Sequence, residues 1–323
     1  MKFKLSEILK DKKTVALGGH VRPDGDCVGS CMGLYMYLTE QFPDISFDVY
    51  LESVAPCFKR IQRTEEIKNT VEQDKIYDLF ICLDCGSVDR LGFSGGLFEQ
   101  AKRTACIDHH ISNDAFADHN YIVPEASSAS ELVYNLLESD KISKECAEAL
   151  YMGIAHDTGI FQYSCTSPET MIIGADLLRK GIDGSDLIEK TYYEKSFVQT
   201  QILGKALVES FLILDKQCIV SFVSKKDMEF FDALPGDLDG IVSILRQTEG
   251  TEVAIFLYEL EPGVFKVSLR SKGKVNVSSI ARYFGGGGHV RASGASMSGD
   301  VYEIIDKLAE QIGLQLKGSE KTA

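Results

Sequence analysis

Long hydrophobic runs are absent from this chain of 323 residues. No apolar stretch approaches the roughly 18 residues that a membrane-spanning helix requires. The opening residues, Met1 to Ser6, also lack the apolar core of a signal peptide. We therefore expect a cytoplasmic protein with no membrane partner. Hydrophobic residues nevertheless make up 44% of the sequence, which is enough for full cores, and the length favours two domains.

Basic residues are scarce relative to acidic ones. The chain has 34 Lys and Arg against 48 Asp and Glu, which gives a formal net charge of −14 at pH 7. Proteins bind long nucleic acids through many contacts from Lys and Arg to phosphate. The charge balance therefore argues against a long duplex as partner and favours a short oligonucleotide or a mononucleotide over a polymer.

A second CxxC pair is also missing. The nine cysteines are scattered along the chain, and Cys82 and Cys85 have the CxxC spacing that can indicate a zinc site or a redox motif. A zinc ribbon would need another such pair, and residues 77–83 have the composition of a buried strand. We interpret these cysteines as small buried thiols in a reducing compartment.

The first half of the sequence contains strand patterns that alternate with helix patterns. Apolar runs predict strands, and longer segments with helical periodicity predict helices. The strands are expected at 13–17, 47–51, 78–83 and 103–107, and the helices at 29–39, 128–137 and 143–155, the last with Ser143 as N-cap. This order predicts an α/β fold whose N-terminal domain has a doubly wound, mostly parallel sheet.

The second half predicts a smaller C-terminal α/β domain. Two helical segments at 185–193 and 196–208 are expected to connect the domains, and strands, helices and a hairpin at Glu261 to Gly263 follow. The later strands are expected at 211–214, 218–223, 253–260 and 265–269, and the helices at 238–247, 277–284 and 301–312. We expect a first domain at 1–185, a helical linker at 186–210, a second domain at 211–316 and a disordered tail at 317–323.

The loop after the first predicted strand carries His20, Asp24 and Asp26. In an extended loop, residues two apart point to the same side, so the two carboxylates can converge on one site. Gly25 between them allows the backbone to turn. An ordinary Asx turn is the alternative for Pro-Asp-Gly-Asp.

Two further polar groups follow apolar strands. Asp84 comes after the strand at 78–83, and Asp108, His109 and His110 come after the strand at 103–107. Open α/β sheets bind their ligands at the carboxyl ends of their strands, and an ionised carboxylate in apolar surroundings is costly unless it is paired or bound to a metal. A helix N-cap for Asp84 and an exposed histidine loop are the alternatives.

Asp157 is expected at the end of a helix, with Gly159 as terminator. A carboxylate there faces the negative end of the helix dipole, and a bound cation would reverse this unfavourable interaction. His156 would point elsewhere, so we interpret it as structural. Four carboxylates and two imidazoles can hold two divalent metal ions, which indicates hydrolysis of a phosphate ester.

The C-terminal half contains a glycine-rich stretch, residues 285–294, in which His289 and Arg291 lie two residues apart. Its backbone N–H groups could bind an anion, and a flexible linker is the alternative. Arg270 at a predicted strand end offers another guanidinium for phosphate.

In their order along the chain, these stretches resemble the motifs of the DHH phosphoesterase superfamily, and Asp108-His109-His110 corresponds to the motif that names it. The stretches around Arg270 and His289 resemble the associated C-terminal DHHA1 domain. The resemblance covers nearly the whole chain. It is greatest to the short bacterial subgroup of nanoRNases, oligoribonucleases that also dephosphorylate adenosine 3′,5′-bisphosphate (pAp).

The resemblance implies two metal ions in each active site. One would bind His20, Asp24 and Asp84, and the other would bind Asp26, Asp84, His109 and Asp157, so that Asp84 bridges them. Manganese is the implied metal, with Mg²⁺ or Co²⁺ as substitutes, and carboxylate and imidazole ligands suit Mn²⁺ on independent grounds. The implied catalytic residues are Asp84, His110, which would contact the phosphate or the leaving group, and Asp108, which would orient a histidine.

The resemblance also implies a substrate site in the DHHA1 domain and an active site in the cleft between the domains. The implied substrate-binding residues are Arg270, Ser271, Gly287, Gly288, His289 and Arg291. The expected reaction is hydrolysis of oligoribonucleotides of about two to five nucleotides, linear dinucleotides included, to mononucleotides, or of pAp to AMP and phosphate, or both.

Two alternatives stay open at this point. An inorganic pyrophosphatase or exopolyphosphatase would use the same metal chemistry, although it would call for more Lys and Arg near the site. A non-catalytic nucleotide-binding scaffold belongs to another class, but it would have no need of four clustered carboxylates. A homodimer is compatible with the sequence.

Overall fold

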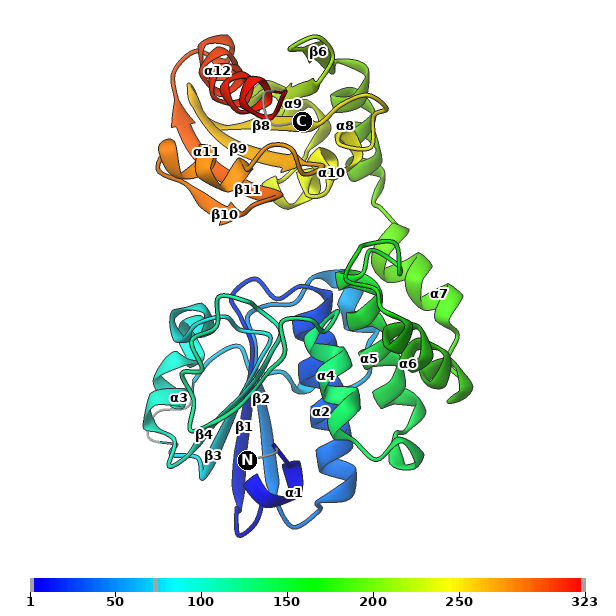
Figure 1. Ribbon diagram of the computed structural model, residues 1–323. Helices are drawn as coiled ribbons and strands as arrows, with labels where there is room; N and C mark the ends of the chain where they lie inside the picture. The colour runs from blue at the N-terminus through cyan, green and yellow to red at the C-terminus, as the bar shows by residue number, and fades with distance from the viewer. Residues whose placement is uncertain (1–2, 72–74, 321–323) are drawn as a thin grey trace. The chain divides into compact units, whose positions relative to one another are not determined.

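The computed structural model describes residues 3–71 and 75–320. The chain divides into two compact units, Met1–Glu194 and Lys195–Ala323 (Figure 1). This division falls inside the segment 186–210 in which a helical connection was predicted.

The sheet of the first unit consists of parallel strands in the order β2-β1-β3-β4-β5. Strand β2 lies on one side of β1, and the chain then crosses to form β3 on the other side of β1. The topological switch point therefore lies between β1 and β3. The strands are β1 Thr14–Gly18, β2 Ser46–Tyr50, β3 Leu79–Leu83, β4 Thr104–Asp108 and β5 His119–Ile122. The predicted parallel α/β sheet is confirmed. Strand β5 was not predicted, because this edge strand is only half-buried and lacks an apolar run.

Helices cover both faces of this sheet (Figure 1). Alternate strand residues pack against α2, α4 and α5 on one face and against η3 and α3 on the other. The helical segments are α1 Leu5–Ile8, α2 Gly25–Gln41, η1 Pro56–Arg60, η2 Thr64–Glu66, η3 Val88–Ser94, α3 Gly95–Gln100, α4 Ala129–Leu136, η4 Ser139–Lys141, α5 Lys144–Asp157, α6 Pro168–Arg179, α7 Gly184–Ile188 and the π-helical turn η5 Glu189–Tyr193. The predicted N-cap of α5 is confirmed, because the Ser143 side chain accepts the N–H of Cys146.

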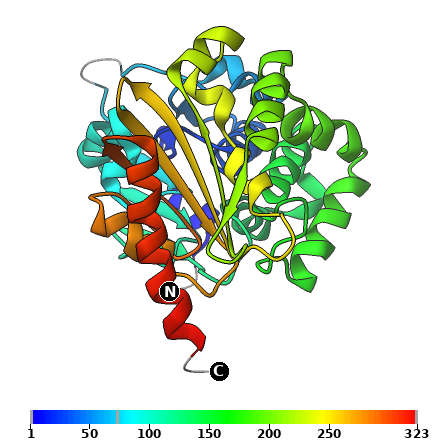
Figure 2. The ribbon, with the colours of Figure 1, turned by 90° about the horizontal axis from the view of Figure 1, so that it is seen from above.

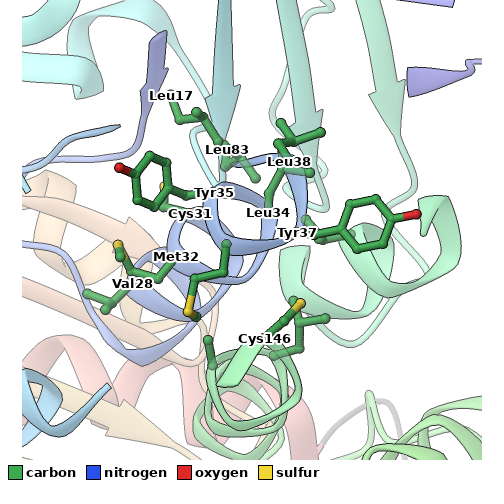
Figure 3. Packing of buried hydrophobic residues seen from close by; sticks show 14 of the residues in the cluster. Leu17, Val28, Cys31, Met32, Leu34, Tyr35, Tyr37, Leu38, Leu83 and Cys146 are labelled. Carbon is green, nitrogen blue, oxygen red and sulfur yellow. The ribbon is translucent and has the colours of Figure 1, made fainter. Parts of the chain in front are cut away.

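Helix α2 is buried along most of its length between the sheet and α5. Figure 3 shows its side chains meeting Leu17 and Leu83 of the strands on one side and Cys146 of α5 on the other. Glycines permit the close contact with α5: a Cβ on Gly29 would lie 2.5 Å from the carbonyl oxygen of Ala149. A larger residue at this position would force the two helices apart.

The second unit contains a mixed sheet in the order β10-β11-β9-β8-β7-β6, in which β7 and β8 are parallel and the other pairs are antiparallel. The hairpin predicted at Glu261 to Gly263 joins β8 to β9 and is confirmed. The strands are β6 Phe211–Ile213, β7 Cys218–Val223, β8 Val253–Glu261, β9 Val264–Ser271, β10 Gly287–His289 and β11 Ala292–Ser298.

Helices also cover both faces of the second sheet. Helices α11 and α12 pack on one face, where α12 is the long red helix of Figure 2, and α8, α9 and α10 pack on the other. The helical segments are α8 Phe197–Val208, α9 Lys225–Phe231, η6 Pro235–Leu238, α10 Ile241–Leu245, α11 Val277–Tyr283 and α12 Val301–Glu320. Among the residues that the structure describes, no helix is both long and apolar enough to cross a membrane.

Three predictions in this unit need correction. The helix expected at 238–247 is the shorter α10, because Gly240 adopts a left-handed conformation at φ 85° and separates it from the 3-10 turn before it. The glycine-rich stretch, for which a flexible linker was the alternative, is partly a strand, since β10 pairs with β11. Helix α12 continues to Glu320, past Lys317, where disorder was expected, because its apolar stripe still packs on the core at Leu316; residues 321–323 lie outside the described residues.

Candidate metal centre

Asp24 and Asp26 lie at the start of α2. The Asp24 side chain is the N-cap and accepts the N–H groups of Asp26 and Cys27, each at 3.1 Å. The prediction of an extended loop was therefore wrong: the helix begins at Gly25, because an aspartate is a favoured N-cap and satisfies two N–H groups that would otherwise lack partners. The two carboxylates are brought together by a helical turn.

Gly25 is required for a different reason from the one predicted. A Cβ at this position would lie 2.2 Å from Cγ of His156, so the ring of His156 packs directly on the backbone between the two aspartates. The His156 Nε2 lies 3.2 Å from the Thr191 hydroxyl, and burial lowers the pKa of His156 to about 4. His156 thus supports the start of α2 as a neutral side chain.

Asp84 follows the fully buried strand β3 and is itself 3% exposed. Its φ of 51° lies in the left-handed region, which aspartate tolerates better than most residues. Its backbone N–H donates to the carbonyl of Ile107 at 3.0 Å. This conformation ends the strand and holds the carboxylate at the carboxyl edge of the sheet.

One oxygen of Asp84 faces the first predicted group of ligands. Asp84 Oδ2 lies 3.4 Å from Nε2 of His20, and Asp24 Oδ2 lies 3.7 Å from the same nitrogen. The His20 Nδ1 is 2.8 Å from the carbonyl oxygen of Val21. Because Nδ1 must carry the proton to donate to a carbonyl, Nε2 presents its lone pair to the carboxylates when the ring is neutral.

The other oxygen of Asp84 faces the second predicted group. Nε2 of His109 lies 3.5 Å from Asp84 Oδ1, 3.2 Å from Asp157 Oδ2 and 3.9 Å from Asp26 Oδ2. Asp157 is the last residue of α5, as expected. The structure thus brings together the six side chains that the sequence singled out as metal ligands and arranges them as two groups around the Asp84 carboxylate.

Asp26 is held in place by the start of helix α4. It is fully buried, and its two oxygens accept the N–H groups of Ala129 and Ser130, at 2.6 and 2.9 Å, at the start of α4. Gly153 of α5 makes room for it, because a Cβ there would lie 2.0 Å from Oγ of Ser130 and 2.9 Å from the Asp26 carboxylate. The helix dipole of α4 favours the ionised form of this carboxylate.

The neighbouring Asp108 holds His110. Asp108 Oδ1 lies 2.7 Å from Nδ1 of His110, and Nδ2 of Asn113 donates to Asp108 Oδ2 at 2.7 Å and to the carbonyl of Cys85 at 3.1 Å. Nδ1 of His110 also lies 3.7 Å from Asp84 Oδ1. The buried Asp108 therefore orients His110 beside the metal ligands. Sequence reasoning missed Asn113, because a polar residue in a loop carries no signal of its partner.

The clustered carboxylates need positive charge beside them to offset their repulsion. Burial disfavours charged imidazoles, but Asp24 and Asp84 outweigh it and raise the pKa of His20 to about 11. Asp84 and Asp26 likewise raise that of His109 to about 10 against burial. Burial and the charge of Asp84 raise the pKa of Asp26 to about 7. Protons can supply the missing charge, and so can divalent cations, which displace them.

The donor set fits divalent cations. Oxygen and imidazole nitrogen ligands of this mixture suit ions such as Mn²⁺. Among the described residues, three sets of donors have ligand atoms within 4.8 Å of one another; they are Asp26, His109 and Asp157; Asp84, His109 and His110; and His20, Cys27 and Asp84. Cys27, which sequence reasoning missed, is buried next to His20 and Asp84. Its position follows from the helix start at Gly25, which the sequence analysis placed too late.

The predicted substrate-binding residues lie together at one end of the second sheet. Arg270 pairs with Ala292 across β9 and β11, Ala292 pairs with His289 across β11 and β10, and the N–H of Ser271 donates to the carbonyl of Arg291 at 3.0 Å. His289 and Arg291 are exposed, Arg270 is half-buried and Ser271 is buried. Gly287 and Gly288 are part of β10. This end of the sheet therefore carries two guanidinium groups and an imidazole.

The comparison with protein families agrees with the two units. The model of the DHH family, N-terminal domain, matches residues 14–154. The model of the DHHA1 domain matches residues 215–314. The first match contains the six clustered metal-ligand candidates except Asp157, and the second contains the predicted substrate-binding residues.

Curated relatives match over nearly their full length. The bifunctional oligoribonuclease and PAP phosphatase NrnA of Thermus thermophilus is 28% identical over 97% of this chain and 93% of its own. The protein of the same name from Bacillus subtilis is 28% identical over 92% and 93%.

Solved structures share the fold. An exopolyphosphatase-related protein from Bacteroides fragilis is 28% identical and superposes with a TM-score of 0.90 over 98% of this chain and 96% of its own. RecJ from Thermus thermophilus, solved with Mn²⁺, is 15% identical and has a TM-score of 0.53 over 97% of this chain and 53% of its own, which indicates likeness of fold alone.

Proposed function

The chain belongs to the DHH family of metal-dependent phosphoesterases, and we propose that it hydrolyses short oligoribonucleotides to mononucleotides and pAp to AMP and phosphate. The proposal includes linear dinucleotides as substrates. Two relatives that align with more than 90% of this chain carry both activities in their names. We further propose manganese as the metal, with two ions per active site.

The observation that supports this proposal most is the arrangement around Asp84. Its two carboxylate oxygens face two different groups of donors, one centred on His20 and the other on His109. A single cation would not need both groups. His20, Asp24 and Asp84 would hold one ion, and Asp26, Asp84, His109 and Asp157 would hold the other. When bound, two such ions lower the pKa of a water molecule and stabilise negative charge on a phosphate.

Two side chains next to the proposed metal ligands would contribute to the reaction at the phosphate. His110 is held by Asp108 through Nδ1, so its Nε2 is the ring nitrogen directed away from that carboxylate. We propose that this nitrogen contacts the phosphate or the leaving oxygen. Asp108 acts through His110 and is a positioning residue. The carboxylate of Asp108 also favours the protonated imidazole, and it thereby raises the pKa of His110.

The DHHA1 domain would supply the positive charge for the substrate. Arg270, His289 and Arg291 lie at one end of its sheet, and charge-assisted hydrogen bonds from such groups bind phosphate strongly. A few contacts of this kind suit a terminal phosphate or a bisphosphate. The net charge of −14 opposes the long track of phosphate contacts that a polymer would need.

The cysteines favour a reducing compartment, and we place the protein in the cytoplasm. All nine cysteines are free thiols, although Cys82 and Cys85 are close in sequence. Secreted proteins commonly use such residues in disulfides.

A substrate panel tests the proposal. Phosphate release and chain shortening would be measured with Mn²⁺ for pAp, pApA, pGpG, a 24-nucleotide RNA, pyrophosphate and polyphosphate. The proposal predicts turnover of pAp and the dinucleotides and little attack on the long RNA. The likeness to an exopolyphosphatase-related protein makes polyphosphate the informative competitor: preferential turnover of polyphosphate or pyrophosphate would replace the proposed function with that of a polyphosphatase or pyrophosphatase.

A further inference from the structure

The turn that follows Asp157 has an uncommon backbone. Gly159, Ile160 and Phe161 are consecutive and have φ angles of 56°, 57° and 60°. A left-handed conformation is costly for bulky residues and above all for a β-branched one. Thr158 stabilises the turn, because its hydroxyl accepts the N–H of Phe161 at 2.9 Å and its carbonyl accepts the N–H of Tyr163 at 2.9 Å. The surrounding structure thus maintains a conformation that the sequence itself does not favour.

This turn determines where the side chain of Tyr163 lies. Phe161 packs inward against Tyr151, with ring centroids 5.8 Å apart, and Tyr163, two residues later, is 44% exposed. A Cβ on Gly159 would lie 2.4 Å from Cζ of Tyr163 and 2.6 and 2.7 Å from its two Cε atoms. Because the two Cε atoms are nearly equidistant, Gly159 lies across one face of the ring. The aromatic ring therefore rests on the backbone only two residues from Asp157.

A second aromatic residue connects Tyr163 to the start of α2. Tyr192, in the π-helical turn η5, lies next to Tyr163, since burial and the nearby Tyr163 hydroxyl raise the pKa of Tyr192. Tyr192 packs edge-on against His156, with ring centroids 5.2 Å apart. His156 in turn packs on Gly25, between Asp24 and Asp26. The Tyr163 ring thus packs on Gly159, two residues after Asp157, and lies next to Tyr192, which packs on His156.

We propose that the ring of Tyr163 is the stacking surface for a nucleobase of the substrate. This inference rests on the proposed function and adds to it a base-binding residue within the DHH domain. Unstacked bases of single-stranded RNA and of nucleotides bind proteins by stacking on aromatic side chains. A flat base suits the aromatic ring of a tyrosine that rests on Gly159, two residues after Asp157. A base attached to a phosphate at the metal centre would lie near that phosphate, which is within reach of a ring at this place in the chain.

The test compares Tyr163→Ala with Tyr163→Phe, which keeps the ring, and with Tyr302→Ala, which removes another exposed tyrosine of this chain (59% exposed) from helix α12. The binding probe is 2-aminopurine riboside 5′-monophosphate, whose fluorescence is quenched when its base stacks. It is titrated into each full-length protein with Mn²⁺. In parallel, kcat/KM is measured for pApA and for the matching dinucleotide that lacks its bases.

We expect Tyr163→Ala to weaken binding of the probe about 5- to 100-fold, the range for one stacked base, and to abolish its quenching. The same variant should lower kcat/KM for pApA by a similar factor and leave the base-free dinucleotide unaffected. Tyr163→Phe, which keeps the ring, should retain the quenching that Tyr163→Ala loses, and Tyr302→Ala should behave as the wild type. Equal losses on both dinucleotides, or normal quenching by Tyr163→Ala, would overturn the stacking role.

The outcome separates this inference from the proposed function. If the wild-type protein hydrolyses neither pApA nor pAp, the proposed function fails, and the probe titration alone decides the stacking surface. Quenching that depends on the Tyr163 ring would then still support it. A wild-type protein that does not bind or quench the probe would overturn it.

Discussion

Asp108 accepts a hydrogen bond from Nδ1 of His110 over 2.7 Å, and this contact positions a histidine that the metal groups do not use in the proposed assignment. Asp108 is buried and is itself held by Asn113. A carboxylate in this position selects the tautomer and the orientation of the ring.

Replacing Asp108 by Asn should impair turnover more than binding. The amide can keep the shape of the side chain but cannot hold the protonated ring as the carboxylate does. We expect kcat to fall about 10- to 100-fold, the range for such supporting residues, with KM and the bound manganese nearly unchanged. Steady-state kinetics and elemental analysis of the variant check this. Loss of metal together with activity would assign Asp108 to the ligands instead.

Asp84→Ala should abolish hydrolysis and remove both metal ions while the fold remains intact. Its carboxylate faces both His20 and His109. The substitution leaves the buried strand β3 and its apolar neighbours unchanged, so the domain should stay folded. Manganese content, activity and circular dichroism would be compared with Asp114→Ala, which removes an exposed aspartate of the same unit. A variant that retains both ions and turns over normally would disprove the bridging role.

His289→Ala and Arg291→Ala should affect the substrate without affecting the metals. A charge-assisted hydrogen bond to phosphate contributes about 1.5–3 kcal/mol, or about 10- to 150-fold. We therefore expect kcat/KM on pAp to fall within this range, through KM or kcat, with full manganese content. Variants indistinguishable from the wild type on pAp would remove these residues from the substrate site.

Asp78, which is not among the predicted site residues, should make the stability of the fold depend on pH. A hydrogen bond from Lys102, with the backbone N–H groups of Lys13 and Thr14, lowers the pKa of Asp78 to about 2. A carboxyl whose pKa is lower in the folded state stabilises the fold above its unfolded pKa of about 4. This contribution is lost as the pH falls toward 2.

Asp78→Asn should therefore lower the thermal midpoint at pH 7, and the difference from the wild type should shrink as the pH falls from 5 to 3. Because Asp78 is partly exposed to solvent, we expect a cost of only about 1 kcal/mol. Thermal unfolding across this pH range measures it, with Asp89→Asn, an exposed aspartate, as control. A difference that stays constant down to pH 3 would contradict the assigned role.

The sequence was sufficient to predict the parallel sheet and the edge at which the polar residues gather. Buried strands such as β3 are continuous apolar runs, and His20, Asp84 and His109 follow three such strands within two residues. Strand order then brings them together without any knowledge of side-chain packing.

Other features depend on contacts that sequence patterns do not encode. The helix start at Gly25 could have been inferred from Asp24 as an N-cap, but Gly25 was interpreted as a turn residue in a loop. Asn113 and Cys27 reach the site only through packing. The left-handed turn at Ile160 and Phe161 has no signature, because these residues ordinarily avoid that conformation, and so the position of Tyr163 could not be predicted.

The most direct measurement of the central claim is hydrolysis of pAp and pApA by protein from which metal has been removed and then restored. The chemistry proposed for the cluster around Asp84 requires bound metal, so activity should depend entirely on added divalent cations. We predict no turnover in excess chelator, with metal-free protein verified by elemental analysis, and recovery when Mn²⁺ is added back at two ions per chain. Sustained hydrolysis of both substrates by verified metal-free protein would contradict the account.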